Sequence, residues 1–404
     1  MQTVFICAAK RTPIGALNGA LSAVPAPKLG ATAIEAALKQ SEIPAQDIDE
    51  VLMGCVLTAG LGQAPARQAS LFASLPPSTP ATTLGKVCGS GLKAVMLGTQ
   101  AIQTGDANIV IAGGMENMSQ APHLLEKSRT GYRLGHQTIT DSMIKDGLWD
   151  VYNQFHMGNA AELCVKKYRF SKSALDEFSI QSYERALQAQ KQGWFQKEMV
   201  SIETVDPRIR GGDTLRGGDI KNTVLITQDE EPTKTPLDKI TSLKPAFEKT
   251  GAITAGNASK LNDGAAALVL MSESEVQKRN LKPLARVVAS AQHAQAPEWF
   301  TTAPVQAIQK VLKKANLKIS DIDLFEINEA FAAVTLAAIE DLNLSMDRVN
   351  VHGGAVALGH PIGASGARIL TTLLYALEQK DLKRGLATLC IGGGEAVAMI
   401  IERP

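Results

Sequence analysis

The chain has 404 residues, which exceeds a typical single domain and predicts two or three domains. Hydrophobic residues make up 45% and charged residues 20%, as in globular proteins, and no apolar run is long enough to span a membrane. The net charge of +1 provides no basic surface field, so neither nucleic acid nor a membrane is an expected partner.

Cysteine usage indicates a reducing compartment. The five cysteines form no CxxC pair, so no metal site is expected, and their odd number favours free thiols. The first residues show neither a secretion signal nor a presequence, and the last three are not a peroxisomal signal. We therefore expect a cytoplasmic protein.

The first third of the chain alternates between helical and strand patterns. A helix is predicted over 28–41 and a strand over 49–56. A turn at 85–89 then leads to a helix over 90–103 and a strand over 108–113.

Residues 119–261 have a different texture, with charges, turn signals and few long apolar runs. A helix is predicted over 171–190, with Ser171 as its N-cap. Stretches expected to be exposed loops lie at 127–135, 206–219 and 228–239. Because long loops on a rigid scaffold often form a binding wall or lid, this segment is predicted to do so.

The last third returns to the first pattern. Helices are predicted over 303–315 and 366–378, and strands over 322–327 and 386–391. Strands that alternate with helices predict largely parallel sheets, and strongly apolar strands predict sheets covered on both faces.

The two ends of the chain also repeat each other in sequence. Residues 33–49 and 307–323 are identical at 7 of 17 aligned positions. Further along, Ser90 matches Ser365, and each lies at the start of a predicted helix. Two copies of one unit are expected to pack as a pseudo-dimer, so a site shared by both halves is the natural place for chemistry.

Two candidate reactive residues lie in equivalent turns of the two copies. Cys88 precedes a predicted helix, where free amides and the helix dipole are expected to lower the pKa of its thiol. The alternative is a buried structural cysteine. His360 lies in the matching turn and is a candidate base for the Cys88 proton, with a core histidine as the alternative and His352 as a competitor.

Two further candidates lie at strand ends. Cys390 ends a predicted strand and leads into the glycines 392–394, whose backbone amides can approach a ligand closely. Filling a strand position is the alternative for this cysteine. Asn328 lies between a strand and a helix, where its side chain either binds an oxyanion or a water, or caps the helix. Taken alone, this residue favours the cap.

Seven separate motifs, in order along the whole chain, resemble those of the thiolase family. They are RTPIG at 11–15, VCGSGLKA at 87–94, AGGMENMS at 112–119, TAGNAS at 254–259, NEAFA at 328–332, GHPIGASGAR at 359–368 and CIGGGEA at 390–396. The resemblance implies an α/β protein with the duplicated thiolase fold, a five-layered αβαβα core with an inserted loop domain. The implied parts are an N-terminal half at 1–118 completed by 262–282, a loop domain at 119–261 over the active site, and a C-terminal half at 283–404.

The resemblance also implies a role for each candidate. Cys88 is the nucleophile that substrate acylates, and His360 activates it. Cys390 is the acid and base for the α-proton of the second acyl-CoA. Asn328 positions a water that forms one oxyanion hole with the His360 side chain, and the amides of Cys88 and Gly392 form the other.

The resemblance implies a substrate with a short acyl chain. His156 and Met157 resemble the pair that lines the acyl pocket of biosynthetic acetoacetyl-CoA thiolases. By the same resemblance, the pantetheine tunnel is lined by Leu148, Ala255, Ser259, Ala330 and Phe331. We expect condensation of two acetyl-CoA to acetoacetyl-CoA and CoA, and thiolysis in reverse, with no cofactor besides coenzyme A as substrate and product. The family also implies a homotetramer or homodimer.

Other members of the fold provide the alternatives. A degradative 3-ketoacyl-CoA thiolase shares this chemistry on longer chains, but such enzymes usually lack the histidine found at 156. A ketosynthase has no equivalent of Cys390 as a base. A non-catalytic CoA-binding member would not need four intact catalytic positions.

Overall fold

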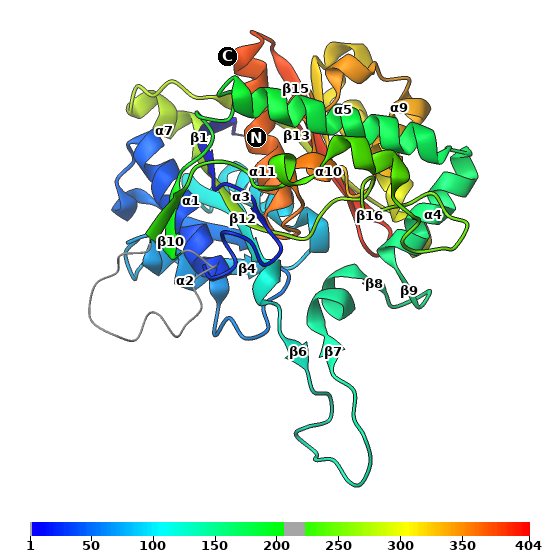
Figure 1. The fold of residues 1–404 in the computed structure, drawn as a ribbon. Coiled ribbons are helices and arrows are strands. Elements are labelled where there is room, and N and C mark those ends of the chain that lie inside the picture. The colour runs from blue at the N-terminus through cyan, green and yellow to red at the C-terminus, as the bar shows by residue number, and fades with distance from the viewer. Residues whose placement is uncertain (1, 206–222) are drawn as a thin grey trace.

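The computed structural model describes residues 2–205 and 223–404, and its central feature is a mixed sheet to which both ends of the chain contribute (Figure 1). The strand order is β14-β15-β16-β13-β1-β12-β5-β3-β4, with β2 beside β12. The strands are β1 (Val4–Arg11), β2 (Gly15–Ala16), β3 (Glu50–Gly54), β4 (Ala81–Leu84), β5 (Ile109–Asn117), β12 (Asn262–Ser272), β13 (Ala285–Ala294), β14 (Leu324–Ile327), β15 (Arg384–Ile391) and β16 (Glu395–Glu402).

Helices pack in layers on the two halves of this sheet. They are α1 (Ala26–Ser41), α2 (Pro65–Phe72), α3 (Ser90–Thr104), α8 (Ala303–Ala315), α9 (Ala332–Leu342) and α11 (Ser365–Gln379). One buried cluster joins α3 and α11 to the inner face of both halves, and two other clusters join α1 and α2, or α8 and α9, to the outer faces. Along β5, Val110 faces the inner cluster and Ile111 faces an outer one. The strands are therefore covered on both faces, in the five-layered αβαβα arrangement that was expected.

The internal repeat is also a repeat of topology. In the N-terminal half, β3 pairs in parallel with β4 and β5, and β5 is followed by antiparallel β12 and β1. In the C-terminal half, β14 pairs in parallel with β15 and with Val349, and β15 is followed by antiparallel β16 and β13. β1 and β13 are equivalent strands, and they join the halves as an antiparallel pair. The duplicated fold is confirmed.

The alternation of elements had predicted largely parallel sheets, and this prediction is wrong. β16 follows β15 through a tight turn in which Gly393 and Gly394 have positive φ, and such a hairpin makes its two strands antiparallel. β12 is the equivalent strand of the first half, and it pairs antiparallel with both β5 and β1. The parallel pairs lie at the outer edges of the two halves.

The two central helices cross where equivalent glycines meet. α3 and α11 each have 15 residues and begin at Ser90 and Ser365. A Cβ on Gly91 would lie 2.8 Å from the backbone nitrogen of Ala367, and a Cβ on Gly366 would overlap the backbone of α3. This crossing therefore requires glycine on both helices, and it brings the turns that precede them close together.

The segment between the two halves contributes its own helices and short strands. They are β6 (His123–Leu124), β7 (Thr140–Asp141), β8 (Trp149–Asp150), β9 (Phe155–His156), α4 (Met157–Tyr168), α5 (Lys172–Lys191), β10 (Ile202–Val205), β11 (Thr223–Ile226) and α6 (Glu231–Lys234). Ser171 caps α5 as predicted, since its side chain accepts a hydrogen bond from the amide of Ala174. The β6–β7 arm extends away from the body (Figure 1). Its 127–135 stretch is largely exposed, as expected, whereas 206–219 lies outside the described residues. The boundaries 1–118, 119–261, 262–282 and 283–404 stay a prediction.

The remaining short helices are α7 (Glu273–Lys278) and α10 (Ala355–Leu358). Across residues 2–205 and 223–404, no helix combines the length and apolarity needed to cross a bilayer. In that same part of the chain, no three His, Cys, Asp or Glu side chains gather in a way that would hold a metal ion.

Candidate active site

Cys88 lies on a strained turn between β4 and α3. The preceding residue, Val87, has a φ of 43°, which is unfavourable for a β-branched residue and typical of functional turns. The Cys88 side chain is half-buried, and burial raises the pKa of its thiol to about 11, against the opposing effect of the backbone amides of Gly392 and Cys88. The expected lowering of this pKa is therefore wrong for the resting protein, because loss of solvation outweighs the amides.

His360 is held in the equivalent turn of the second half. Its backbone amide donates to Asn262 Oδ1 at 2.9 Å. Its Nδ1 lies 2.6 Å from Ser365 Oγ, and that hydroxyl donates its own proton to the carbonyl of Pro361 at 2.9 Å. Because the Ser365 oxygen must then accept, Nδ1 carries the ring proton and Nε2 keeps its lone pair as an acceptor. Burial and the positive charge of Arg368 lower the pKa of His360 to about 3, so the imidazole is neutral and able to take up a proton.

Asn328 does not cap a helix, so the reading that its position alone favoured is wrong. The helix that follows it, α9, begins four residues later and has Phe331 at its N-cap. The Asn328 side-chain nitrogen instead lies 3.4 Å from His360 Nε2. Its Oδ1 is buried and has no hydrogen-bond partner among residues 2–205 and 223–404. A buried, unpaired amide oxygen beside His360 is a position that suits an ordered water.

Cys390 is fully buried near the end of β15, behind residues that line the cavity described below. It packs in one cluster with Met157, Ala330 and Phe331. Burial and the nearby Cys88 sulfur raise the pKa of the Cys390 thiol well above its usual value. Gly392 follows, and it lines the cavity described below together with Cys88. That the amides of these two residues form one oxyanion hole stays a prediction.

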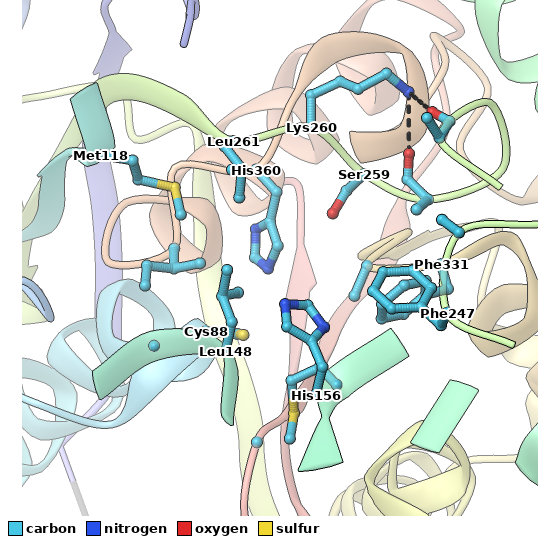
Figure 2. A pocket seen from close by; sticks show the side chains of 18 of the residues that line it. Cys88, Met118, Leu148, His156, Phe247, Ser259, Lys260, Leu261, Phe331 and His360 are labelled. Atoms are coloured by element: carbon cyan, nitrogen blue, oxygen red, sulfur yellow. Dashed lines mark hydrogen bonds between the residues drawn. The ribbon is translucent and has the colours of Figure 1, made fainter. Parts of the chain in front are cut away.

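A cavity of about 450 Å³ opens beside these groups (Figure 2). Cys88, His360 and Gly392 line it, and Figure 2 shows Cys88, His156 and His360 pointing into the same space. Every residue predicted to contact the substrate also lines it, namely Leu148, His156, Met157, Ala255, Ser259, Ala330 and Phe331. Asn328 and Cys390 are not part of the lining and lie behind it. The structure thus brings the sequence candidates to one largely apolar pocket, as ligand sites require.

Family models match both halves of the chain. The thiolase N-terminal domain matches residues 4–274, and the thiolase C-terminal domain matches residues 281–403. The chain belongs to the thiolase family.

Individual thiolases match along the whole length. An acetyl-CoA acetyltransferase of Cupriavidus necator is 49% identical over 403 residues, which cover 100% of this chain and 100% of that protein. A probable acetyl-CoA acyltransferase of Staphylococcus aureus is 47% identical over 404 residues, again 100% of both chains. A solved structure of a thiolase from Ascaris suum in complex with coenzyme A is 42% identical, covers 100% of both chains and superposes with a TM-score of 0.92. The predicted thiolase fold is confirmed.

His156 has a defined tautomer in this thiolase. As the N-cap of α4, its Nδ1 accepts a hydrogen bond from the amide of Gly158 at 3.1 Å. Its ring stacks on Phe247 with centroids 5.0 Å apart, and burial lowers its pKa. The neutral ring therefore carries its proton on Nε2, which makes it a hydrogen-bond donor.

His352, the competing histidine, is a core residue. It packs against Trp194 and Phe195 with ring centroids 4.9 and 6.0 Å away. It does not line the cavity, and burial lowers its pKa to about 4. His352 is therefore the core histidine of the two, and His360 is the one at the cavity.

Several residues that shape the site escaped the sequence analysis. Ser365 lies five residues after His360 in the same motif, and a hydroxyl that close to a candidate base was an available signal. Glu116 accepts hydrogen bonds from the amides of Val56, Leu57 and Gly363, so it joins the turns of both halves. Burial raises its pKa to about 7. No local pattern marks Glu116, because its partners are distant in sequence.

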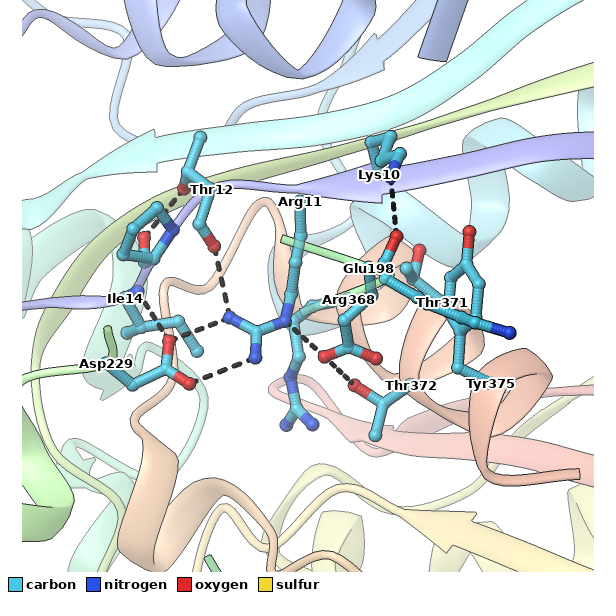
Figure 3. Close-up of polar contacts among 12 residues, drawn as sticks. Lys10, Arg11, Thr12, Ile14, Glu198, Asp229, Arg368, Thr371, Thr372 and Tyr375 are labelled. Carbon is cyan, nitrogen blue, oxygen red and sulfur yellow. Dashed lines mark hydrogen bonds and ion pairs between the residues drawn. The ribbon is translucent and has the colours of Figure 1, made fainter. Parts of the chain in front are cut away.

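The 228–239 stretch is only in part the exposed loop that its charges suggested, since Asp229, Glu231 and Pro232 are buried. Asp229 accepts hydrogen bonds from the guanidinium of Arg11 at 2.7 and 3.0 Å, and Glu198 accepts another at 2.5 Å (Figure 3). Arg11, Glu198 and Asp229 are buried, and the neighbouring Glu231 lines the cavity. These carboxylates tie the inserted segment to β1, since a buried cation must be paired.

Proposed function

We propose that this protein is an acetyl-CoA C-acetyltransferase, which condenses two acetyl-CoA to acetoacetyl-CoA and CoA and catalyses thiolysis in reverse. The observation that carries the proposal is the shared cavity, onto which one half presents Cys88 and the other presents His360 and Gly392. The names of the relatives from Cupriavidus necator and Staphylococcus aureus support acyl transfer to or from CoA. The proposal needs no cofactor besides coenzyme A, as substrate and product.

In the first step, the Cys88 thiol attacks the carbonyl of acetyl-CoA and its proton moves to His360 Nε2, the unprotonated ring nitrogen, in place of the long 3.4 Å contact from the Asn328 amide. The amides of Cys88 and Gly392 stabilise the oxyanion as it forms. When the intermediate collapses, the CoA sulfur leaves and takes the proton of Cys390. The products are acetyl-Cys88, free CoA, a protonated His360 and a Cys390 thiolate.

In the second step, the Cys390 thiolate removes an α-proton from a second acetyl-CoA. The enolate oxygen forms hydrogen bonds with protonated His360 and with a water held by Asn328 Oδ1, the orphaned acceptor beside this histidine. The enolate carbon attacks acetyl-Cys88, and the departing Cys88 sulfur takes the proton from His360. All three side chains return to their starting states, so protons balance over the cycle.

The raised pKa values fit this order. Neither thiol is ionised at rest, so Cys88 is activated during attack and not beforehand. Acetylation of Cys88 keeps that sulfur uncharged, so no Cys88 thiolate opposes ionisation of Cys390 in the second step.

The experiment is thiolysis of acetoacetyl-CoA, followed by mass spectrometry of the acetylated protein. Wild type should carry one acetyl group on Cys88, and Cys88→Ala should lose both the adduct and the activity. An active Cys88→Ala variant would refute the proposal. A faster rate on ten-carbon than on four-carbon ketoacyl-CoA would instead favour the degradative 3-ketoacyl-CoA thiolase.

We also propose that the enzyme works in the cytoplasm as a homotetramer or homodimer. All five cysteines are free, the state that a reducing compartment maintains. The exposed Leu125, Leu134 and Ile139 between β6 and β7 provide apolar surface for a second copy. Analytical ultracentrifugation would test the assembly, and a monomer at micromolar concentration would refute it.

A further inference from the structure

Lys260 lies in the wall of the cavity, just before β12. Its side chain is among those that line the same pocket as Cys88 and Ser259. Its ammonium donates to the carbonyls of Ala255 at 2.6 Å and Ala258 at 3.0 Å (Figure 2). Both acceptors belong to residues that also line the cavity.

Other polar groups of the turn that Lys260 closes bond within the turn or to the opposite wall. The amide of Thr254 donates to Asn257 Oδ1 at 2.8 Å, and the amide of Gly256 donates to Thr254 Oγ1 at 3.1 Å. The amide of Ser259 donates to the carbonyl of Ala330 at 3.0 Å, on the opposite wall. Side chains of the turn thus satisfy the amides of Thr254 and Gly256, whereas Lys260 satisfies the carbonyls of Ala255 and Ala258.

Burial disfavours the charged form of Lys260. Loss of solvation lowers its pKa to about 8, and the carboxylate of Glu231 opposes that shift, so the side chain stays protonated at pH 7. The ring of Tyr183 lies below the ammonium, 5.7 Å from Nζ to the centroid. An ammonium has three N–H donors, and two of them are committed to the turn.

We propose that Lys260 is a positioning residue for acyl-CoA binding: it fastens the 255–258 turn so that Ala255, Ala258 and Ser259 form one rigid wall of the cavity. This inference rests on the proposed function for the identity of the ligand. Without the ammonium, the carbonyl of buried Ala258 loses its partner, that of exposed Ala255 has only solvent, and the wall gains freedom that substrate binding must remove.

The kinetic test compares Lys260→Met with Lys249→Met, a control at an exposed lysine outside the cavity lining. Lys260→Met should raise KM for acetoacetyl-CoA about tenfold, equivalent to about 1.4 kcal/mol, while kcat stays within about twofold. The control should match wild type. An unchanged KM in Lys260→Met, or a kcat that falls as much as KM rises, would overturn the proposal.

Two further measurements distinguish a local role of Lys260 in ordering the 255–258 turn from a general loss of stability. In Lys260→Met, amide hydrogen exchange should accelerate over residues 254–259 and in no other part of the chain. In a second variant, Lys260→Ala, ammonium chloride should restore the KM, whereas sodium chloride should not. Faster exchange throughout the chain, or equal effects of the two salts, would refute the role. If wild type lacked activity on every acyl-CoA, the proposed function would fail, whereas local exchange would still report whether Lys260 fastens the turn.

Discussion

Replacing Ser365 with alanine tests how the tautomer of His360, the proposed base of this thiolase, is fixed. The Ser365 hydroxyl accepts the Nδ1 proton of His360 at 2.6 Å and is itself fixed by the carbonyl of Pro361. This bond places the free lone pair on Nε2, the atom that takes the Cys88 proton in the proposed mechanism. Ser365→Ala leaves a buried N–H without a partner and releases the preference for the productive tautomer.

The size of the effect follows from the burial of both groups. Ser365 is fully buried and His360 is 5% exposed, so no solvent replaces the lost acceptor. An unsatisfied buried donor costs about 1–3 kcal/mol, and about 1.4 kcal/mol corresponds to tenfold in rate. We therefore expect kcat to fall about 10- to 100-fold, with little change in KM, because no substrate contact is removed.

The assay is thiolysis of acetoacetyl-CoA together with the rate at which iodoacetamide alkylates Cys88 at pH 7. Both rates should fall in Ser365→Ala by similar factors. Thr371→Val is the matched control, since it removes another buried hydroxyl of α11 that bonds only a helix carbonyl. Rates within twofold of wild type in Ser365→Ala would refute the reasoning, as would an equal loss in Thr371→Val.

Three other predictions concern stability and specificity. His156→Ala removes the acceptor for the amide of Gly158 and should cost about 1 kcal/mol in chemical denaturation, while raising the ratio of ten-carbon to four-carbon thiolysis; an unchanged ratio would contradict the specificity role. Burial raises the pKa of Glu116 from 4.5 to about 7, so the folded state binds the extra proton and the free energy of unfolding should fall by up to about 3 kcal/mol as pH rises through that window. Glu116→Gln should reduce this slope, and an identical slope in both proteins would count against it. Gly366→Ala places a Cβ against the backbone of α3 and should lower the unfolding free energy by about 3 kcal/mol, whereas Gly85→Ala, with open space around it, should behave like wild type; equal stability of the two variants would argue against the helix crossing.

Much of the framework follows from local sequence. The starts of α3 and α11 were predicted from the Ser-Gly pairs of the repeat, because small residues after a turn allow a helix to begin and pack closely. The cap of α5 at Ser171 was predicted for the same local reason. The residues predicted for the pocket were identified through motifs, which keep their meaning even when far apart along the chain.

The direction of the sheets and the state of the site depended on tertiary structure. The antiparallel strands β12 and β16 look like other apolar strands in sequence, and their pairing partners decide their direction. The thiol of Cys88 lies beside helpful amides, yet burial raises its pKa, and burial is a property of the assembled fold. The charged 228–239 stretch became partly internal for an equally non-local reason, since its carboxylate meets Arg11 from the other end of the chain. Local sequence thus determined which elements form and which residue types are present, whereas only the packing of distant segments decided their solvation, and with it their charge.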